Sequence, residues 1–188
     1  MEVSDFVMAE LPRSPARVLE VGCGQGELAF DLARAGHDVL AIDPEPPDGP
    51  LFRRTTIEEL EAVGLFHAVV ASRSLHHVAD LAVALDKVVE LLGTNGLVLI
   101  DDFGWERLDG PSARRIGIPV EEWRDEHEHL HTAEAMLSEL DARFDRRSFS
   151  WEPSLYRERR RVVTEDVERE LIAGEKLAPI GFRYVGNR

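Results

Sequence analysis

The sequence predicts an α/β protein with a doubly wound, mostly parallel β-sheet. An apolar strand near residue 18 runs through three glycines into a helical pattern that begins at Leu28. Apolar strands and amphipathic helices then alternate up to residue 100. The strand at Leu97–Ile100 is continuously apolar, as expected for a parallel strand that is covered on both faces. The 188 residues are too few for two ordinary domains, so we expect one domain over residues 1–188.

The most informative segment is the strand, turn and helix of residues 18–28. Glycines at positions 22, 24 and 26 permit positive φ and let a ligand approach the main chain closely. The helix after them offers unpaired N–H groups at its N-terminus. An α/β fold builds a nucleotide pocket in this way at the end of its first strand.

Two details indicate which nucleotide this turn suits. The dinucleotide fingerprint is G-x-G-x-x-G, whereas the third glycine here is at position 26 and is followed by Glu27. Glu20 lies two positions before the first glycine. A carboxylate there would repel a pyrophosphate, but it would attract a sulfonium or an amino group, or brace the loop through backbone N–H groups. The segment therefore resembles the E-x-G-x-G-x-G motif of class I S-adenosylmethionine-dependent methyltransferases.

This resemblance extends over roughly residues 16–188 and is more specific for the cofactor half than for the substrate half. It implies a Rossmann-like methyltransferase fold, with a seven-stranded sheet whose last strand is antiparallel. It also implies S-adenosyl-L-methionine as cofactor and S-adenosyl-L-homocysteine as product. The residues that we assign to the cofactor site on this basis are Glu20, Gly22, Cys23, Gly24, Gly26, Asp43, Pro44, Thr56, Ile57, Glu58, Ser72 and Arg73.

The second strand is predicted at Asp38–Ile42, after Gly36 ends the first helix. Asp43 follows this strand, 21 positions after Gly22 (43 − 22). A carboxylate at about this spacing can accept hydrogen bonds from both ribose hydroxyls. The alternative is that Asp43 and Pro44 merely start a turn.

A proline-rich loop at residues 44–50 leads to a weak third strand at Leu51–Arg53. Thr56–Leu60 then predicts the start of a short helix. In the resembled family the residues after the third strand approach the adenine ring, a position that Thr56, Ile57 and Glu58 occupy here. The same residues also suit a helix N-terminus, and both roles can hold together.

The fourth strand is predicted at His67–Ser72, with His67 where the family commonly has Asp. His76 and His77 follow at the carboxyl end of this central strand, where open α/β sheets bind ligands. They are our candidate catalytic residues, with the carboxylates at 101–102 also within reach. A general base contributes only if the nucleophile must lose a proton. The alternative is that one histidine packs under the loop and the other faces solvent.

The remaining elements complete the alternation. Asp80 and Thr132 are each placed to cap a helix. The elements predicted after residue 80 are a helix over 81–92, the strand at 97–100, a helix after 132, a strand at 144–156, a helix at 164–173 and a terminal strand at 180–185.

Residues 103–131 interrupt this alternation on the ligand side of the sheet. They contain Trp105, Trp123 and the histidines at 127, 129 and 131. An insertion there is well placed to cover a substrate. We therefore expect a mobile lid in which Trp105 or Trp123, with a histidine from 127 to 131, forms the acceptor-side wall. The histidine spacing suits a strand rather than the helical i, i+4 zinc pair, and we predict no metal site.

Composition limits the function further. The net charge of −14 disfavours a nucleic-acid substrate, because phosphate binding requires a basic surface. We interpret the basic run Arg157–Arg161 as a solvated or carboxylate-paired face. The single cysteine, Cys23, fits a reducing compartment. There is no apolar run of membrane-spanning length, and the acidic start lacks the pattern of a signal peptide. We therefore expect a cytoplasmic location.

These observations predict a methyltransferase that acts on a small-molecule acceptor by in-line displacement. A cofactor-binding module without turnover, serving as a regulatory or partner subunit, remains an alternative because no residue is marked as an essential base. A methyltransferase acting on a modified RNA base is disfavoured by charge. An NAD-dependent oxidoreductase is disfavoured by Glu27 and by the absence of a substrate domain. The acceptor atom and the oligomeric state are not predicted.

Overall fold

The computed structural model describes residues 2–61, 64–159 and 161–188, and its centre is one seven-stranded sheet. The strands lie in the order β3-β2-β1-β4-β5-β7-β6. Neighbours from β3 to β5 pair in parallel, and β7 pairs antiparallel with both β5 and β6. The strand bounds are β1 Arg17–Val21, β2 Asp38–Asp43, β3 Phe52–Arg54, β4 Phe66–Ser72, β5 Leu92–Phe103, β6 Asp145–Glu152 and β7 Gly181–Asn187. The predicted fold, with its antiparallel last strand, is confirmed.

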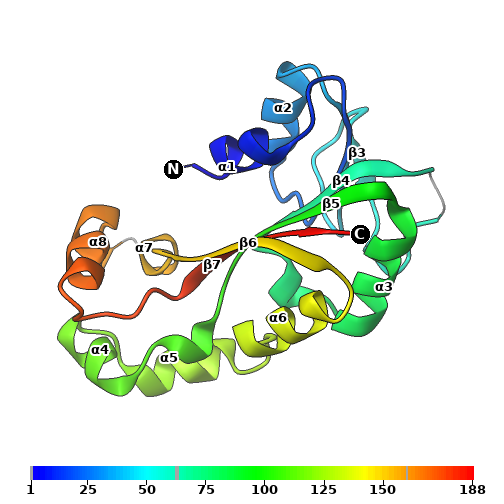
Figure 1. The fold of residues 1–188 in the computed structure, drawn as a ribbon. Helices are drawn as coiled ribbons and strands as arrows, with labels where there is room; N and C mark the ends of the chain where they lie inside the picture. Colours follow the sequence, from blue (N-terminus) through cyan, green and yellow to red (C-terminus); the bar gives the residue numbers. More distant parts are fainter. Residues whose placement is uncertain (1, 62–63, 160) are drawn as a thin grey trace.

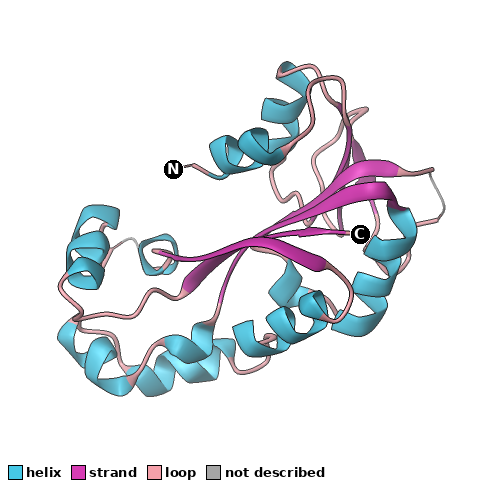
Figure 2. Ribbon diagram, in the orientation of Figure 1, coloured by secondary structure: helices cyan, strands magenta, loops and turns pink. Residues whose placement is uncertain are grey.

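Helices flank both faces of this sheet (Figure 2). Asp80 and Thr132 cap α3 and α6 as predicted, because their side-chain oxygens accept hydrogen bonds from Val83 N and Ala135 N. The helix bounds are α1 Val3–Glu10, α2 Glu27–Arg34, α3 Leu81–Leu91, α4 Gly110–Arg115, α5 Val120–His127, α6 Ala133–Asp141, α7 Leu155–Glu158 and α8 Glu165–Ala173. Two 3₁₀ turns, η1 at Leu75–His77 and η2 at Trp105–Arg107, follow β4 and β5.

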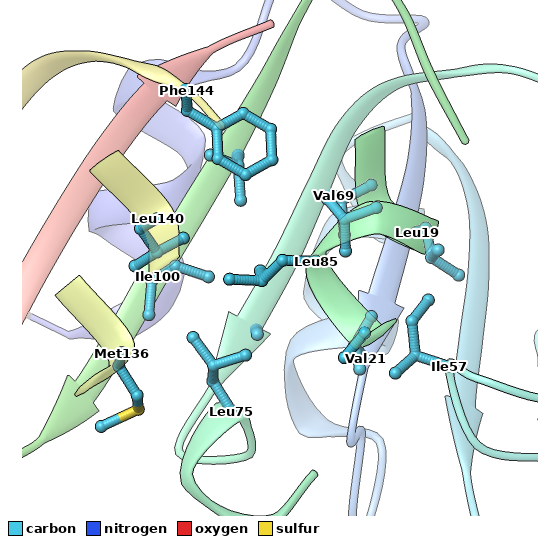
Figure 3. Packing of buried hydrophobic residues seen from close by; sticks show 14 of the residues in the cluster. Leu19, Val21, Ile57, Val69, Leu75, Leu85, Ile100, Met136, Leu140 and Phe144 are labelled. Carbon is cyan, nitrogen blue, oxygen red and sulfur yellow. The ribbon is translucent and has the colours of Figure 1, made fainter. Parts of the chain in front are cut away.

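Two hydrophobic clusters cover the two faces of the sheet. On one face, α3 and α6 pack against the central strands, and Figure 3 shows Leu85 and Met136 among the buried residues with Val69 and Ile100. On the other face, α1 and α2 bury Phe6 and other side chains against β1, β2 and β4. Burial on both faces explains why the central strands are continuously apolar.

A third cluster lies beyond the carboxyl end of β5, where Figure 1 shows α4, α5, α7 and α8. It joins the predicted lid, residues 103–131, to a second stretch of chain between residues 155 and 180. Its buried members are Phe103, Leu108, Ala113, Ile118, Trp123, Leu155, Val163, Leu177 and Ile180. Residues 103–131 are therefore largely helical and share a hydrophobic core with the C-terminal third of the chain.

Two predicted elements are wrong in detail. Residues 57–59 form a turn instead of a helix, because so short a segment does not offset the cost of helix nucleation. The strand predicted at 144–156 ends at Glu152. Pro153 cannot donate to a ladder, and the buried carboxylate of Glu168 accepts hydrogen bonds from the N–H groups of 154–156. The backbone of residues 154–156 therefore leaves the sheet and enters α7.

Two further local expectations differ from the structure. The histidines at 127–131 were expected to suit a strand, but His127 is the last residue of α5 and stacks on Trp123 one turn earlier. Nδ1 of His127 lies 2.7 Å from the carbonyl oxygen of Trp123, which fixes its ring along the helix. The helix α1 was not predicted, and its buried side chains are Phe6 and Val7.

Candidate functional site

The glycine turn follows β1 and adopts a left-handed backbone at each glycine. Gly22, Gly24 and Gly26 have φ values of 71°, 50° and 79°. A Cβ on Gly22 would lie 2.2 Å from Cβ of Ser74, and one on Gly26 would lie 2.5 Å from the ring of Phe52. A Cβ on Gly24 would meet nothing within 4 Å. The turn is therefore packed against its neighbours at its first and last glycines and open at Gly24.

Glu20 lies under this turn with 3% of its surface exposed. Burial raises the pKa of its carboxyl to about 8, a backbone hydrogen bond from Ala29 opposes the rise, and the nearby charge of Asp43 adds to it. Oε2 of Glu20 has no hydrogen-bond partner among the described residues. Because Ala29 lies in the first turn of α2, Glu20 both braces the helix N-terminus and keeps an unpartnered oxygen.

Asp43, at the end of β2, also holds the glycine turn. Oδ2 accepts a hydrogen bond of 2.9 Å from Gly24 N, and Oδ1 accepts one of 2.8 Å from Glu45 N. Pro44 beside it is exposed, whereas Cys23 is buried in the turn. Burial, followed by the charges of Glu20 and Asp43, raises the pKa of the Cys23 thiol to about 12, so this thiol stays protonated.

The residues predicted beside the adenine ring lie in the turn after β3. Ile57 is 3% exposed and belongs to the core under the sheet. Thr56 and Glu58 are half-buried. Oγ1 of Thr56 accepts a hydrogen bond from Glu59 N, and Oε1 of Glu58 accepts one from Ala79 N. The side chain of Ile57 is thus a packing group, and the polar groups of this turn connect it to its own backbone and to the segment before α3.

The segment after β4 crosses the glycine turn. Ser72 ends β4, and Arg73 follows with a φ of 54°. Ser74 donates a hydrogen bond of 2.6 Å from Oγ to the carbonyl oxygen of Val21. Positive φ is uncommon for a residue with a side chain and costs free energy. The tight contact between Ser74 and Gly22 brings the two predicted halves of the site together.

His76 and Asp102 form a buried pair beside this contact. Nδ1 of His76 lies 2.5 Å from Oδ1 of Asp102, and the two residues are 4% and 3% exposed. Asp102 also accepts hydrogen bonds from the backbone N–H groups of Leu75, His76 and Phe103. An ionised carboxylate only accepts, so Nδ1 donates and Nε2 is the nitrogen left to accept a proton.

A cavity of about 280 Å³ adjoins this pair. Its lining combines imidazoles, two arginines, two glutamates and two apolar side chains. The lining residues are Arg73, His76, His77, Phe103, Glu126, His127, His129, Leu130, Glu158 and Arg159. Burial lowers the pKa of both His77 and His127, and the neighbouring His76 also lowers that of His77. These two imidazoles are therefore biased toward the neutral form.

Of the two tryptophans that were alternatives for the wall, Trp105 lines a cavity and Trp123 does not. His127 and His129 line the 280 Å³ cavity, and Trp105 lines a second cavity of about 400 Å³ with Arg124 and others. Trp123 is fully buried, and its Nε1 donates a hydrogen bond to the carbonyl oxygen of Trp105. Trp123 thus supports the wall from behind and does not line it.

Sequence reasoning missed two lining residues that lie outside the predicted lid: Glu158 and Arg159. The basic run at 157–161 was the available signal, and its interpretation as carboxylate-paired is confirmed for Arg157 and Arg159, which pair with Asp101 and Glu126. Arg160 lies outside the described residues. The run reaches the cavity through the ion pair of Arg159 with Glu126 of α5. Nothing in the sequence indicates this pairing.

Two searches of the described residues complete the description of the site. No group of three or more His, Cys, Asp or Glu side chains in 2–61, 64–159 and 161–188 has a geometry that could hold a metal ion. Within the same ranges, no helix is both long and apolar enough to cross a membrane.

Comparison with known proteins identifies the family. Residues 2–149 match the model of a methyltransferase domain. The chain belongs to this family, the class I S-adenosylmethionine-dependent methyltransferases. The resemblance inferred from the glycine turn is thereby confirmed.

Curated methyltransferases and a solved structure are similar to this chain. A ubiquinone biosynthesis O-methyltransferase of Azorhizobium caulinodans is 32% identical over 103 residues, which are 47% of this chain and 41% of that protein. The protein of the same name from Cereibacter sphaeroides is 35% identical over 105 residues, 48% of this chain and 42% of that protein. The matched region thus spans less than half the length of these relatives.

The fold agrees over nearly the whole chain with a solved methyltransferase. The structure of an S-adenosylmethionine-dependent methyltransferase from Mesorhizobium loti aligns with a TM-score of 0.68 and 18% identity, covering 98% of this chain and 96% of that one. At this identity the likeness concerns the fold alone.

Proposed function

We propose that this chain transfers a methyl group from S-adenosylmethionine to a hydroxyl oxygen of a small molecule. The observation that carries the proposal is the His76–Asp102 pair, buried at the edge of a cavity next to the glycine turn. Both lie at the carboxyl ends of β4 and β5, where open α/β sheets bind ligands.

The glycine turn fits the family's cofactor in two respects. Gly24 leaves open space at a left-handed backbone, which permits close approach of a ligand to the main chain. Oε2 of Glu20 has no partner among the described residues, and a positively charged ligand beside this buried carboxyl would favour its ionised form. Asp43 would hold the ribose, and the turn at 56–58 would lie by the adenine. When bound, S-adenosylmethionine supplies an activated methyl group.

The residues on the acceptor side would hold the substrate and remove its proton. Asp102 fixes the His76 ring through Nδ1, which leaves Nε2 to accept the proton of the attacking hydroxyl. His77, whose pKa is lowered by burial, lines the same cavity and would relay that proton outward. The lid residues at 127–130 would exclude water and hold the acceptor in line.

Oxygen as the acceptor atom is supported by two arguments. A hydroxyl gains most from a base because it must lose a proton when it is methylated, and a histidine braced by a carboxylate suits that task. The curated relatives named above are O-methyltransferases. Since the matched region is under half of each relative, the nature of their substrates is not transferred to this chain.

A methyl-transfer assay against a panel of small hydroxyl compounds tests the proposal. His76→Gln should lower kcat by about 100-fold or more, because it removes the group that accepts the proton of the hydroxyl. Asp102→Asn should lower kcat with little change in KM, because it disturbs the histidine tautomer and leaves the cavity walls unchanged. His37→Gln is the matched control and should behave as the wild type, because half-buried His37 lies outside the cavity lining.

Two outcomes would contradict the proposal. Tight binding of S-adenosylhomocysteine with no turnover on any hydroxyl, amine or thiol acceptor would favour the binding module considered above. Turnover by His76→Gln at the wild-type rate would show that the acceptor needs no base from this residue.

A further inference from the structure

We propose that the acceptor carries a carboxylate group, which replaces the side chain of Glu158 at the guanidinium of Arg73. This inference rests on the proposed function and narrows it to small hydroxylated carboxylic acids. It also moves Arg73 from the cofactor side, where sequence reasoning had assigned it, to the acceptor side.

The backbone of Arg73 aims its side chain into the cavity. Its φ of 54° is left-handed, and its N–H donates a hydrogen bond of 2.8 Å to the carbonyl oxygen of Asp101. Such strain persists where the surroundings impose it, most often at binding and catalytic sites. The guanidinium carbon lies 5.1 Å from the centre of the Phe103 ring, and NH1 donates to Ser154 Oγ. Arg73 is thus held at a set place in the cavity wall.

The charged partner of Arg73 comes from α7. Glu158 is the last residue of that helix, its side chain is 17% exposed, and it forms an ion pair with the guanidinium of Arg73. Glu158 lines the same cavity as Arg73 and His76. A carboxylate of the protein therefore already occupies the position that we assign to the carboxylate of a substrate.

The side chain of Arg73 is 29% exposed, so its guanidinium gains from an anion beside it and can exchange that anion for a ligand. Desolvation lowers the pKa of Arg73 below its usual range, so the charged guanidinium needs an anion beside it. A substrate carboxylate that takes the place of Glu158 keeps Arg73 paired, and it releases Glu158 toward solvent. A neutral substrate group would leave Arg73 either with Glu158 or without a counter-charge.

Among the described residues, the other arginine that lines the cavity already has an anion beside it. Arg159 pairs with Glu126, as Arg157 of α7 pairs with Asp101. Asp102 is taken by His76 and by backbone N–H groups. Phe103 supplies an apolar surface between Arg73 and His76, with ring contacts to both. The cavity wall thus presents a cation, an apolar ring and a base in that order. A carboxylic acid with a planar ring matches this order when its carboxylate lies at Arg73 and its hydroxyl at Nε2 of His76.

Ligand-observed NMR titration with benzoate and benzamide, on the protein saturated with S-adenosylhomocysteine, tests the inference. These probes differ in charge and share one ring. Benzoate should bind at least about tenfold more tightly than benzamide, as expected for a charge-assisted bond. Glu158→Gln should tighten benzoate binding several-fold by removing the competing carboxylate, and Arg73→Gln should remove the preference for benzoate. Phenyl phosphate is the third probe and should bind no better than benzoate.

The matched controls are Glu170→Gln and Arg161→Gln, which change exposed residues of the same region and should leave every probe's affinity unchanged. Equal binding of benzoate and benzamide, or weaker benzoate binding in Glu158→Gln, would overturn the inference. Stronger binding of phenyl phosphate would replace the carboxylate by a phosphate. If Arg73→Gln does not fold, the Glu158→Gln result and the ratio of the two probes still decide. Turnover of a neutral hydroxyl compound together with no benzoate preference would refute this inference and leave the proposed function standing.

Discussion

Oδ2 of Asp43 accepts a hydrogen bond of 2.9 Å from the backbone N–H of Gly24. This bond ties the tip of β2 to the one glycine of the turn at which an added Cβ would meet nothing within 4 Å. Oδ1, the other carboxylate oxygen of Asp43, accepts a hydrogen bond from Glu45 N. The carboxylate that the sequence assigns to the ribose therefore also sets the shape of the turn, so that replacing it affects both.

Asp43→Ala should weaken S-adenosylhomocysteine binding by at least about tenfold, because it removes a charge-assisted acceptor. Titration calorimetry on the folded variant measures this. Asp48→Ala, an exposed carboxylate of the same loop, should bind as the wild type. An unchanged affinity of Asp43→Ala would mean that the ribose is held elsewhere.

Gly24→Ala and Gly22→Ala should separate binding from folding. At Gly24 the new methyl meets open space, so the free energy of unfolding should fall only by the left-handed strain of about 1–2 kcal/mol, while S-adenosylhomocysteine affinity should fall at least about tenfold. At Gly22 the methyl would lie 2.2 Å from Cβ of Ser74, and overpacking adds about 1–3 kcal/mol or more. Urea unfolding and calorimetry measure both. Full binding by a stable Gly24→Ala protein would show that no ligand approaches the turn there.

Glu20→Gln should stabilise the cofactor-free protein in a pH-dependent way. The pKa of Glu20 is raised from 4.5 to about 8 in the folded chain, so between these values the folded state holds a proton that the unfolded state has lost. Rising pH therefore lowers the free energy of unfolding of the wild type. The free energy of unfolding of the variant should equal that of the wild type below pH 4.5 and exceed it at pH 7 by on the order of 3 kcal/mol.

Urea denaturation across this pH range measures that difference. Glu27→Gln, which changes the exposed first residue of α2, is the control. Its free energy of unfolding should depend on pH as that of the wild type does. Parallel curves for Glu20→Gln as well would mean that Glu20 titrates as an ordinary carboxyl.

The cofactor half of the fold could be predicted from local sequence signals. The glycines, Asp43 and the caps Asp80 and Thr132 act within their own turns or helix ends, so their patterns are visible along the chain. The seven-stranded sheet and its antiparallel last strand followed from the alternation of elements and from the family resemblance.

The acceptor half could not be predicted in the same way, because its contacts join distant segments. The strand ends placed Asp102 within reach of His76, 26 positions away, but nothing in the sequence joins Glu158 to Arg73, 85 positions apart (158 − 73). Trp123 looks like a wall residue in the sequence, yet the burial that removes it from the wall depends on packing against the segment 155–180. The hydrophobic periodicity within one segment carries no information about which residue of a distant segment it will contact.

The lid assignment of residues 103–131 remains a prediction. Backbone hydrogen exchange in this segment should slow when the protein holds S-adenosylhomocysteine and the acceptor that the transfer assay identifies, because a filled cavity orders its walls. Protection confined to residues 20–77, with no change in 103–131 on adding acceptor, would instead make the segment a structural elaboration.

Calorimetric titration with S-adenosylhomocysteine, with NAD as the competing ligand, tests the central claim most directly. The glycine turn, the unpartnered oxygen of Glu20 and the placement of Asp43 predict a dissociation constant in the micromolar range, a binding free energy of roughly −7 to −8 kcal/mol, and no measurable binding of NAD. Binding of NAD without binding of S-adenosylhomocysteine would contradict the account.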